Sequence, residues 1–207
     1  MIKAEVNITG TVRRSASIRT DRNNQPYVSF VMSVSLADGS GTRDIRVFVS
    51  VPQARQSDLS VYTEGQRVTA SGTMDIRRKD DGLSFYLTAR LVTAENVPAL
   101  DAISGTLSFR GYLKKENIFD ERTSKNGRPY LLFSAHSSEK VGDNFVSTWV
   151  TFMRFPEKNA SVESIKPDWL RPRAHVDISG DLRISFYKEA PSLSCIVREM
   201  TEHINNS

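Results

Sequence analysis

The chain contains one turn-and-strand pattern twice, and this repeat constrains the fold more than any other feature. Residues 19–27 read RTDRNNQPY and residues 122–130 read RTSKNGRPY, so the copies lie 103 positions apart in a chain of 207 residues. Asn-Asn and Asn-Gly favour tight turns, because Asn and Gly tolerate the left-handed backbone conformation. A run typical of a β-strand follows each turn, and a spacing of half the chain indicates a duplicated module.

Other landmarks keep nearly the same spacing. Gly10 is matched by Gly111 after 101 positions, and Gly72 by Gly180 after 108 positions. Offsets that drift this little are typical of short loop insertions within a repeated domain. Modules of about 100 residues are also a common domain size. We therefore expect one domain at 1–97, a linker at 98–103 and a second domain at 104–207.

The alternation of apolar and polar residues predicts five strands in each half. Residues 43–51, for example, place Ile45, Val47 and Val49 on one face and Arg46 and Phe48 on the other. The expected strands span 2–14, 27–36, 43–51, 67–74 and 83–92 in the first half and 104–114, 130–136, 145–155, 174–187 and 192–200 in the second.

A short helix is expected between the third and fourth strands of each half. Residues 52–62 carry apolar positions at helical spacing and end near Gly65, and residues 157–170 form a weaker equivalent interrupted by Pro167. Five strands with one helix at this place is the order of an OB-fold, a partly open Greek-key barrel. The expected fold class is therefore all-β, with two tandem OB-folds.

Composition removes several classes of function. No apolar run approaches the roughly 18–20 residues of a membrane helix. One cysteine, Cys195, and three scattered histidines supply no zinc constellation, and no glycine-rich phosphate loop or catalytic spacing stands out. We therefore expect no metal, no cofactor and no enzyme. The net charge of +4 is modest, so the placement of the charges matters more than their sum.

The ordered series of motifs resembles the bacterial single-stranded DNA-binding protein family, present twice. In that family a tyrosine, a glycine, a valine and a second glycine follow the helix, and residues 62–72 match this segment in the first half. The family also carries a tryptophan six residues before a phenylalanine, and Trp149 and Phe155 match this pair in the second half. Tyr187 falls where the family places a further base-stacking aromatic residue.

The resemblance implies sequence-independent binding of single-stranded DNA by stacking of rings on bases and by cations that meet phosphates. The second half is expected to stack on bases. The first half, where Arg46 takes the tryptophan position, is expected mostly to attract the strand through its positive charge. The implied binding residues are Trp149, Phe155, Tyr187, Phe186, Arg183, Arg122, Lys114, Lys115, Arg46, Phe48, Arg77, Arg78, Lys79, Tyr86 and Arg19.

Two alternatives stay open at this point. Arg77, Arg78 and Lys79 also suit an ordinary solvated turn, and aromatic residues of small barrels are commonly core residues. Protein interfaces are enriched in Trp, Tyr, Phe and Arg as well, so a tandem OB-fold protein-interaction scaffold without nucleic-acid binding is the alternative function.

The family resemblance implies protection of single strands in replication, recombination or repair, with RNA as an alternative ligand. It also implies a homodimer that presents four OB-folds. The strand-like pattern begins at Ile2, so we expect no signal peptide, and with Cys195 unpaired we expect a cytoplasmic location. The acidic C-terminal tail by which the family recruits partners is not found in residues 202–207.

Overall fold

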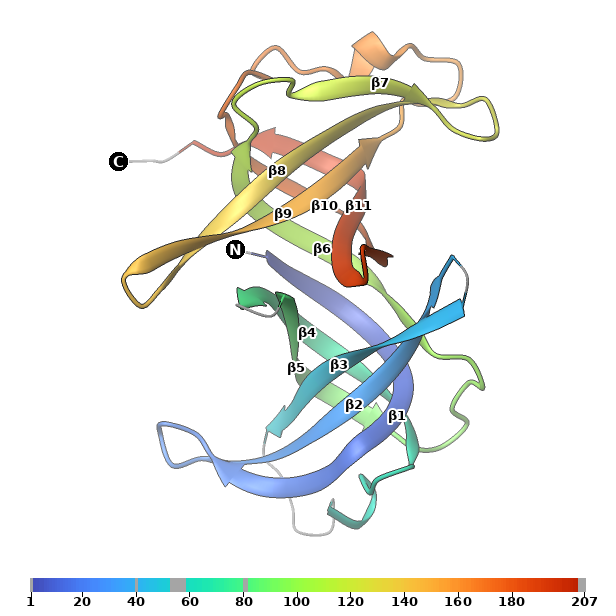
Figure 1. The fold of residues 1–207 in the computed structure, drawn as a ribbon, viewed down its shortest axis with the longest axis vertical. Coiled ribbons are helices and arrows are strands. Elements are labelled where there is room, and N and C mark those ends of the chain that lie inside the picture. Colours follow the sequence, from blue (N-terminus) through green and yellow to red (C-terminus); the bar gives the residue numbers. More distant parts are fainter. Residues whose placement is uncertain (1, 40, 53–58, 80–81, 205–207) are drawn as a thin grey trace. The chain divides into compact units, whose positions relative to one another are not determined.

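The computed structural model describes residues 2–39, 41–52, 59–79 and 82–204 of the chain. Most of these residues lie in β-strands, so the fold is all-β (Figure 1). The contacts divide the chain into two compact units. The N-terminal unit contains Lys3–Gly105 together with Ser185–Pro191, and the C-terminal unit contains the rest.

The N-terminal unit is a five-stranded barrel. Its strands are β1 (Ile2–Thr20), β2 (Pro26–Asp38), β3 (Gly41–Pro52), β4 (Arg67–Lys79) and β5 (Gly82–Thr93). Hydrogen bonding runs in the order β2-β3-β5-β4-β1, and a further pairing of β2 with β1 closes the circle. The β3–β5 pair is parallel. This pair and the circular strand order together give the Greek-key order of an OB-fold.

The C-terminal unit repeats the pairing. It uses β6 (Ala102–Leu113), β8 (Pro129–Val141), β9 (Asn144–Arg154), β10 (His175–Tyr187) and β11 (Ala190–Glu202), with the short strand β7 (Phe119–Thr123) added along β8. The order is β6-β10-β11-β9-β8, and β6 also pairs with β8. The β9–β11 pair is again parallel.

The strand alternation places the predicted core residues inside. Ile45, Val47 and Val49 of β3 are buried, whereas Arg46 and Phe48 between them are exposed. Phe30 and Phe152 are also buried. A small barrel gains most of its stability from such inward apolar positions, because their surface is removed from water.

The repeated motif forms the same hairpin loop in both units. The amide of Asp21 donates to the carbonyl of Gln25 at 3.0 Å, and the equivalent amide of Ser124 donates to the carbonyl of Arg128 at 2.8 Å. A residue with positive φ stands at the same place in each loop, Asn24 (58°) and Gly127 (73°). The choice of Asn or Gly there follows from that backbone conformation.

Two expectations about the elements need correction. The predicted helix at 157–170 is only a four-residue 3-10 helix, Val162–Ile165, because Pro156 and Pro167 bracket it. The expected helix at 52–62 lies largely outside the described residues. The first strand was expected to end at residue 14, yet β1 continues to Thr20 through two bulges, and β7 takes the corresponding place in the second unit.

Candidate binding surfaces

Two aromatic rings stack on the outer face of the N-terminal unit. Phe48 of β3 lies opposite Tyr86 of β5 in the parallel register, and their ring centroids are 5.3 Å apart at an interplanar angle of 20°. Both rings point outward because their chain neighbours fill the core. Phe48 is 42% exposed, so the stacked pair presents a flat surface to solvent.

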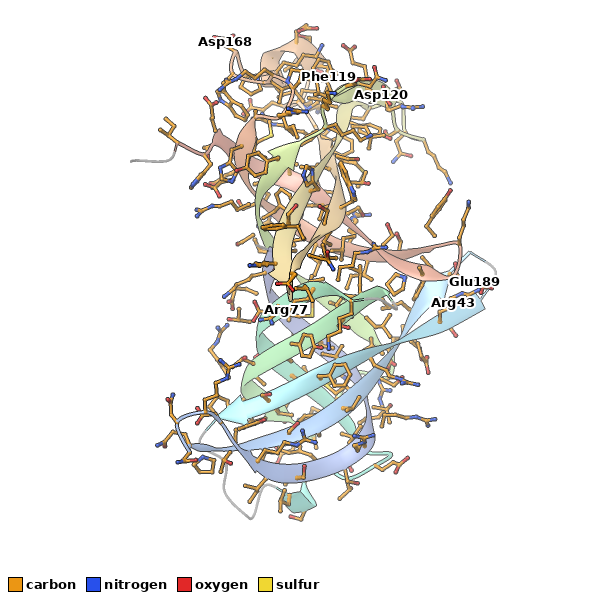
Figure 2. All side chains as sticks on the ribbon, turned by 60° about the vertical axis from the view of Figure 1, so that its left-hand side comes forward. Arg43, Arg77, Phe119, Asp120, Asp168 and Glu189 are labelled. Atoms are coloured by element: carbon orange, nitrogen blue, oxygen red, sulfur yellow. The ribbon has the colours of Figure 1, made fainter. Side chains whose placement is uncertain are left out.

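Cations flank this pair. The guanidinium carbon of Arg77 lies 5.9 Å from the Tyr86 ring centroid, and the Lys79 Nζ lies 5.2 Å from it. Arg77 stands near the end of β4 (Figure 2). A cation over an aromatic face is held by the ring quadrupole. We call Phe48, Tyr86, Arg46, Arg77 and Lys79 the Phe48 platform.

A groove of about 290 Å³ adjoins the platform. It is lined by Arg13, Arg14, Val31, Arg46 and Phe48. The strand register explains this grouping, because Arg14 lies opposite Val31 and Val31 lies opposite Phe48. None of its three arginines forms an ion pair with an acidic side chain in the described ranges. The groove therefore combines an apolar floor with cations that are available to an anion.

The C-terminal unit carries a longer line of rings. Trp149 of β9 contacts His136 of β8 at a centroid distance of 4.7 Å, and His136 lies 6.2 Å from Tyr112 of β6. Tyr112 stacks on His175 of β10 at 4.3 Å and 11°, and His175 meets His203 edge-on at 4.4 Å. Tyr112 and Trp149 are 43% and 48% exposed. We call these five residues the ring row.

One end of the ring row is anchored by a carboxylate. Asp177 accepts a hydrogen bond from Arg110 Nε at 2.7 Å, and its other oxygen lies 2.7 Å from His203 Nδ1. Burial acts to raise the pKa of Asp177, but the hydrogen bonds from Arg110 and His203 outweigh it and hold the pKa below its ordinary value. Asp177 therefore remains ionised beside the ring row.

Phe155 lies apart from Trp149. The two residues are six positions apart, about 20 Å along an extended chain, and β9 ends at Arg154 between them. Phe155 stacks on Tyr130 at 5.0 Å, and the Arg128 guanidinium carbon lies 5.0 Å from its ring centroid. Tyr130 and Arg128 belong to the repeated turn motif, so this ring pair braces the turn, and Phe155 itself is half-buried.

The remaining predicted residues lie mostly on the surface. Arg122 pairs with Asp120 on β7 at 3.2 Å. Tyr187 is 69% exposed at the end of β10, and Phe186 is half-buried beside it. Both belong to Ser185–Pro191, which is part of the N-terminal unit. Among the remaining predicted cations, Arg19, Arg78, Lys114, Lys115 and Arg183 are exposed and form no ion pair with a described residue.

Sequence reasoning missed Tyr112, His136 and His175. The repeat itself carries the signal that could have found the middle of the ring row. Ser33 pairs with Arg46 in the first unit, and 103 positions later His136 pairs with Trp149 in the second. Because an antiparallel hairpin of this kind is expected in both halves, the repeat spacing is enough to place His136 beside Trp149.

The described residues contain neither a metal-binding cluster nor a membrane-spanning helix. Within them, no group of three or more His, Cys, Asp or Glu side chains is placed to hold a metal ion. No helix there has the length and apolar character needed to cross a membrane.

Comparison with known proteins gave structural similarities only. No family model matches the chain, and no curated protein matches it. The wild-type single-stranded DNA-binding protein from Thermus aquaticus is 13% identical, covers 99% of this chain and 94% of its own, and has a TM-score of 0.46. The mitochondrial single-stranded DNA-binding protein Rim1 from S. cerevisiae is 22% identical over 49% of this chain and 96% of its own, with a TM-score of 0.37.

A small single-stranded DNA-binding protein from Streptomyces coelicolor is 17% identical over 45% of this chain and 90% of its own, with a TM-score of 0.33. Similarities of this size do not establish a function for the chain.

Proposed function

We propose that this chain is a tandem OB-fold protein that binds single-stranded nucleic acid without sequence preference. The observation that carries the proposal is the Phe48 platform, in which two stacked rings on an outer barrel face lie among cations. OB-folds bind oligonucleotides across the face of their second and third strands and the adjoining loops. Phe48 lies on the third strand, and Arg77 and Lys79 lie at the fourth-to-fifth strand hairpin.

The chemistry of the platform suits an unpaired strand better than a duplex. Exposed bases have flat faces that stack on aromatic side chains, with about 1–3 kcal/mol per base and little dependence on sequence. In a duplex these faces are already covered by neighbouring base pairs. Cations beside the rings meet the phosphates and release counterions, which adds affinity at low salt.

Trp149 supplies a second stacking surface in the C-terminal unit. It is 48% exposed, on the third strand of that barrel, at the register position that Arg46 holds in the first. We propose that both units contact one strand or two, with Phe155, Tyr187, Phe186, Arg183, Arg122, Lys114, Lys115, Arg78 and Arg19 as additional contacts.

The finer parts of the proposal rest on the sequence resemblance. They are a role in replication, recombination or repair in the cytoplasm, a homodimer with four OB-folds, and non-enzymatic action. Light scattering coupled to size-exclusion chromatography measures the dimer directly. A mass of one chain at micromolar concentration would contradict the proposed homodimer, and the proposal of strand binding would be unaffected.

Anisotropy titration of a labelled dT oligomer tests strand binding. If about four phosphates are neutralised, the affinity falls about 50-fold between 50 and 200 mM salt, from a slope of about −0.7 per phosphate. Duplex DNA of equal length is expected to compete weakly, and a rU oligomer reports the preference between DNA and RNA. The alternative, a protein-interaction scaffold, predicts no binding to either oligomer at any salt concentration.

A further inference from the structure

The ring row contains every histidine of the chain. His136, His175 and His203 come from three separate segments, and Tyr112 and Trp149 complete the line. From β10 through β6 and β8 to β9 the row crosses three strand-to-strand gaps of about 4.8 Å, or about 14 Å in all. Neighbouring bases in a stacked strand are about 3.4 Å apart, so the row has room for more than one base.

The barrel does not need these rings in order to fold. The same register positions in the N-terminal unit are occupied by Arg67, Thr11, Ser33 and Arg46, which pair across β4, β1, β2 and β3. No ring stands in that line, although the strand pairing is the same. The ring row is therefore an addition to one copy of the barrel, on its outer face, where it is available to a ligand.

Two histidines of the row have an unused ring nitrogen. The Nδ1 atoms of His136 and His175 are buried and have no hydrogen-bond partner among the described residues. Each nitrogen is either a donor or an acceptor, depending on the tautomer, and leaving it unpaired costs free energy. Because both nitrogens are buried, a ligand acts on them through its charge, and a negative charge brought to the row favours the protonated form of either ring.

The surroundings favour the neutral form of these rings before a ligand arrives. Burial lowers the pKa of His136. Burial also lowers the pKa of His175, assisted by the nearby His203 and Arg110 and opposed by Asp177. Charged residues that are close to the row in sequence include Lys114, two residues after Tyr112, Lys140, four after His136, Arg173, two before His175, and Glu202, next to His203. No charged side chain stands on the outward face of β9 among its described residues, where Phe145, Ser147, Thr151 and Met153 flank Trp149.

We propose that the ring row is an extended stacking site for unpaired bases, and that His136 and His175 take up protons when a strand binds. This inference rests on the proposed strand binding and names the proton as its regulator. A bound strand places phosphates near His136 and His175, and the negative charge favours their protonated form. Because the complex then holds more protons than the free protein, affinity increases as the pH falls through the histidine range.

The test is the affinity for a dT oligomer measured from pH 5.5 to 8.0 at constant salt, for the wild type and for the double variant His136→Phe, His175→Phe. Phenylalanine keeps a flat ring at both positions and removes the protonation. Wild-type affinity is expected to rise toward low pH, by about tenfold for each histidine whose pKa increases by one unit on binding. The double variant is expected to lose most of this rise, whatever its affinity at pH 8.0.

Controls separate this inference from the proposed function. The terminal amino group also titrates near the upper end of the range, and it is common to all variants, so the comparison cancels it. Phe48→Ala, in the other unit, is expected to weaken binding equally at every pH. Near-UV circular dichroism defines the usable range, because a lowered folded-state pKa means that stability is lost as pH falls through the histidine range.

A second measurement needs no variant. NMR titration of the histidine ring protons, with and without the dT oligomer, gives each pKa directly, and those of His136 and His175 are expected to rise on binding. Absence of dT binding at every pH would overturn the proposed function. Binding with unchanged histidine pKa values, or with a pH dependence that survives in the double variant, would overturn this inference alone.

Discussion

Phe48 is the side chain on which strand binding depends most in the N-terminal unit. Replacing it with alanine removes the stacking surface but leaves the barrel core intact, because the ring is 42% exposed and points away from the core. Phe48→Ala is expected to reduce the free energy of dT binding by about 1–3 kcal/mol. Anisotropy titration of a labelled dT oligomer measures the loss.

A matched control for this prediction is Leu91→Ala. Leu91 is 62% exposed on β5 of the same unit and lies outside the platform. Its removal is expected to leave dT affinity unchanged. Equal losses in the two variants would show that exposed apolar surface in general, rather than the stacked ring pair, governs the affinity.

Cys195 gives a residue-scale prediction about the core. The thiol is buried on β11, and burial raises its pKa to about 12, with a further contribution from Asp181. Because the thiolate is the reactive form, the folded protein at pH 8 is expected to react very slowly with a disulfide reagent. Full reaction is expected in denaturant. Rapid stoichiometric labelling of the folded chain would contradict the buried position.

At the scale of the elements, four glycines permit strands to cross closely in both barrels. A Cβ at Gly72 would lie 2.2 Å from the Thr88 carbonyl oxygen, and one at Gly180 would lie 2.0 Å from the Ile196 carbonyl oxygen. Gly10 and Gly111 approach the Ser33 and His136 carbonyls in the same manner. The obstacle is backbone in every case, so a side chain cannot be accommodated by a simple rotation.

Gly72→Ala is therefore expected to lower the free energy of unfolding by about 1–3 kcal/mol or more. Urea unfolding followed by circular dichroism measures it. Gly41→Ala is the control, because no atom lies within 4 Å of a Cβ built there and its φ is not positive. If both variants have wild-type stability, the strand crossing is looser than the structure shows.

The segment before β6 is fastened to the N-terminal barrel by a charged contact. Asp101 Oδ1 lies 2.7 Å from Arg67 Nη1, its other oxygen accepts a hydrogen bond from the Ser35 amide at 2.8 Å, and Arg67 also donates to the Pro98 carbonyl. Asp101→Asn removes the charge and leaves one partner unpaired. The expected loss of stability is about 1.5–3 kcal/mol.

Asp75→Asn is the comparison for this contact. Asp75 pairs with Lys3 at 3.7 Å, and this pair is more exposed than the Arg67–Asp101 pair. Surface pairs contribute about 0–1 kcal/mol. The Asp101 variant is therefore expected to unfold at a clearly lower urea concentration than the Asp75 variant. Similar midpoints would mean that Asp101 is no better shielded from solvent than Asp75.

Strands that are determined by a local sequence pattern were predicted well, whereas strands that depend on pairing with distant residues were not. Strand alternation identified the core of β3, because Ile45, Val47 and Val49 are neighbours in the sequence as well as in space. The extension of β1 to Thr20 escaped prediction, since its outer residues are polar and are held by pairing with β2 rather than by burial. The strand β7 was missed for the same reason, as it carries Asp120, Glu121 and Arg122.

At the scale of the whole molecule, the sequence repeat predicted the features that the two units share. It did not predict the features that differ between them. A spacing of 103 residues correctly related the two hairpin loops, and nearly the same spacing related the glycine crossings. The full ring row could not be foreseen from local pattern, because Tyr112, His136 and His175 meet only through strand pairing between distant segments. The Phe48 platform was anticipated in its members, but the stacking of Phe48 on Tyr86 depends on the parallel β3–β5 register.

The most direct test of strand binding by exposed rings uses Trp149 as its own reporter. Trp169→Phe leaves Trp149 as the single tryptophan of the chain. Addition of a dT oligomer at 50 mM salt is expected to quench its fluorescence to saturation, and raising the salt to 200 mM is expected to restore most of it. An emission that stays unchanged at both salt concentrations, with the protein folded, would contradict the account.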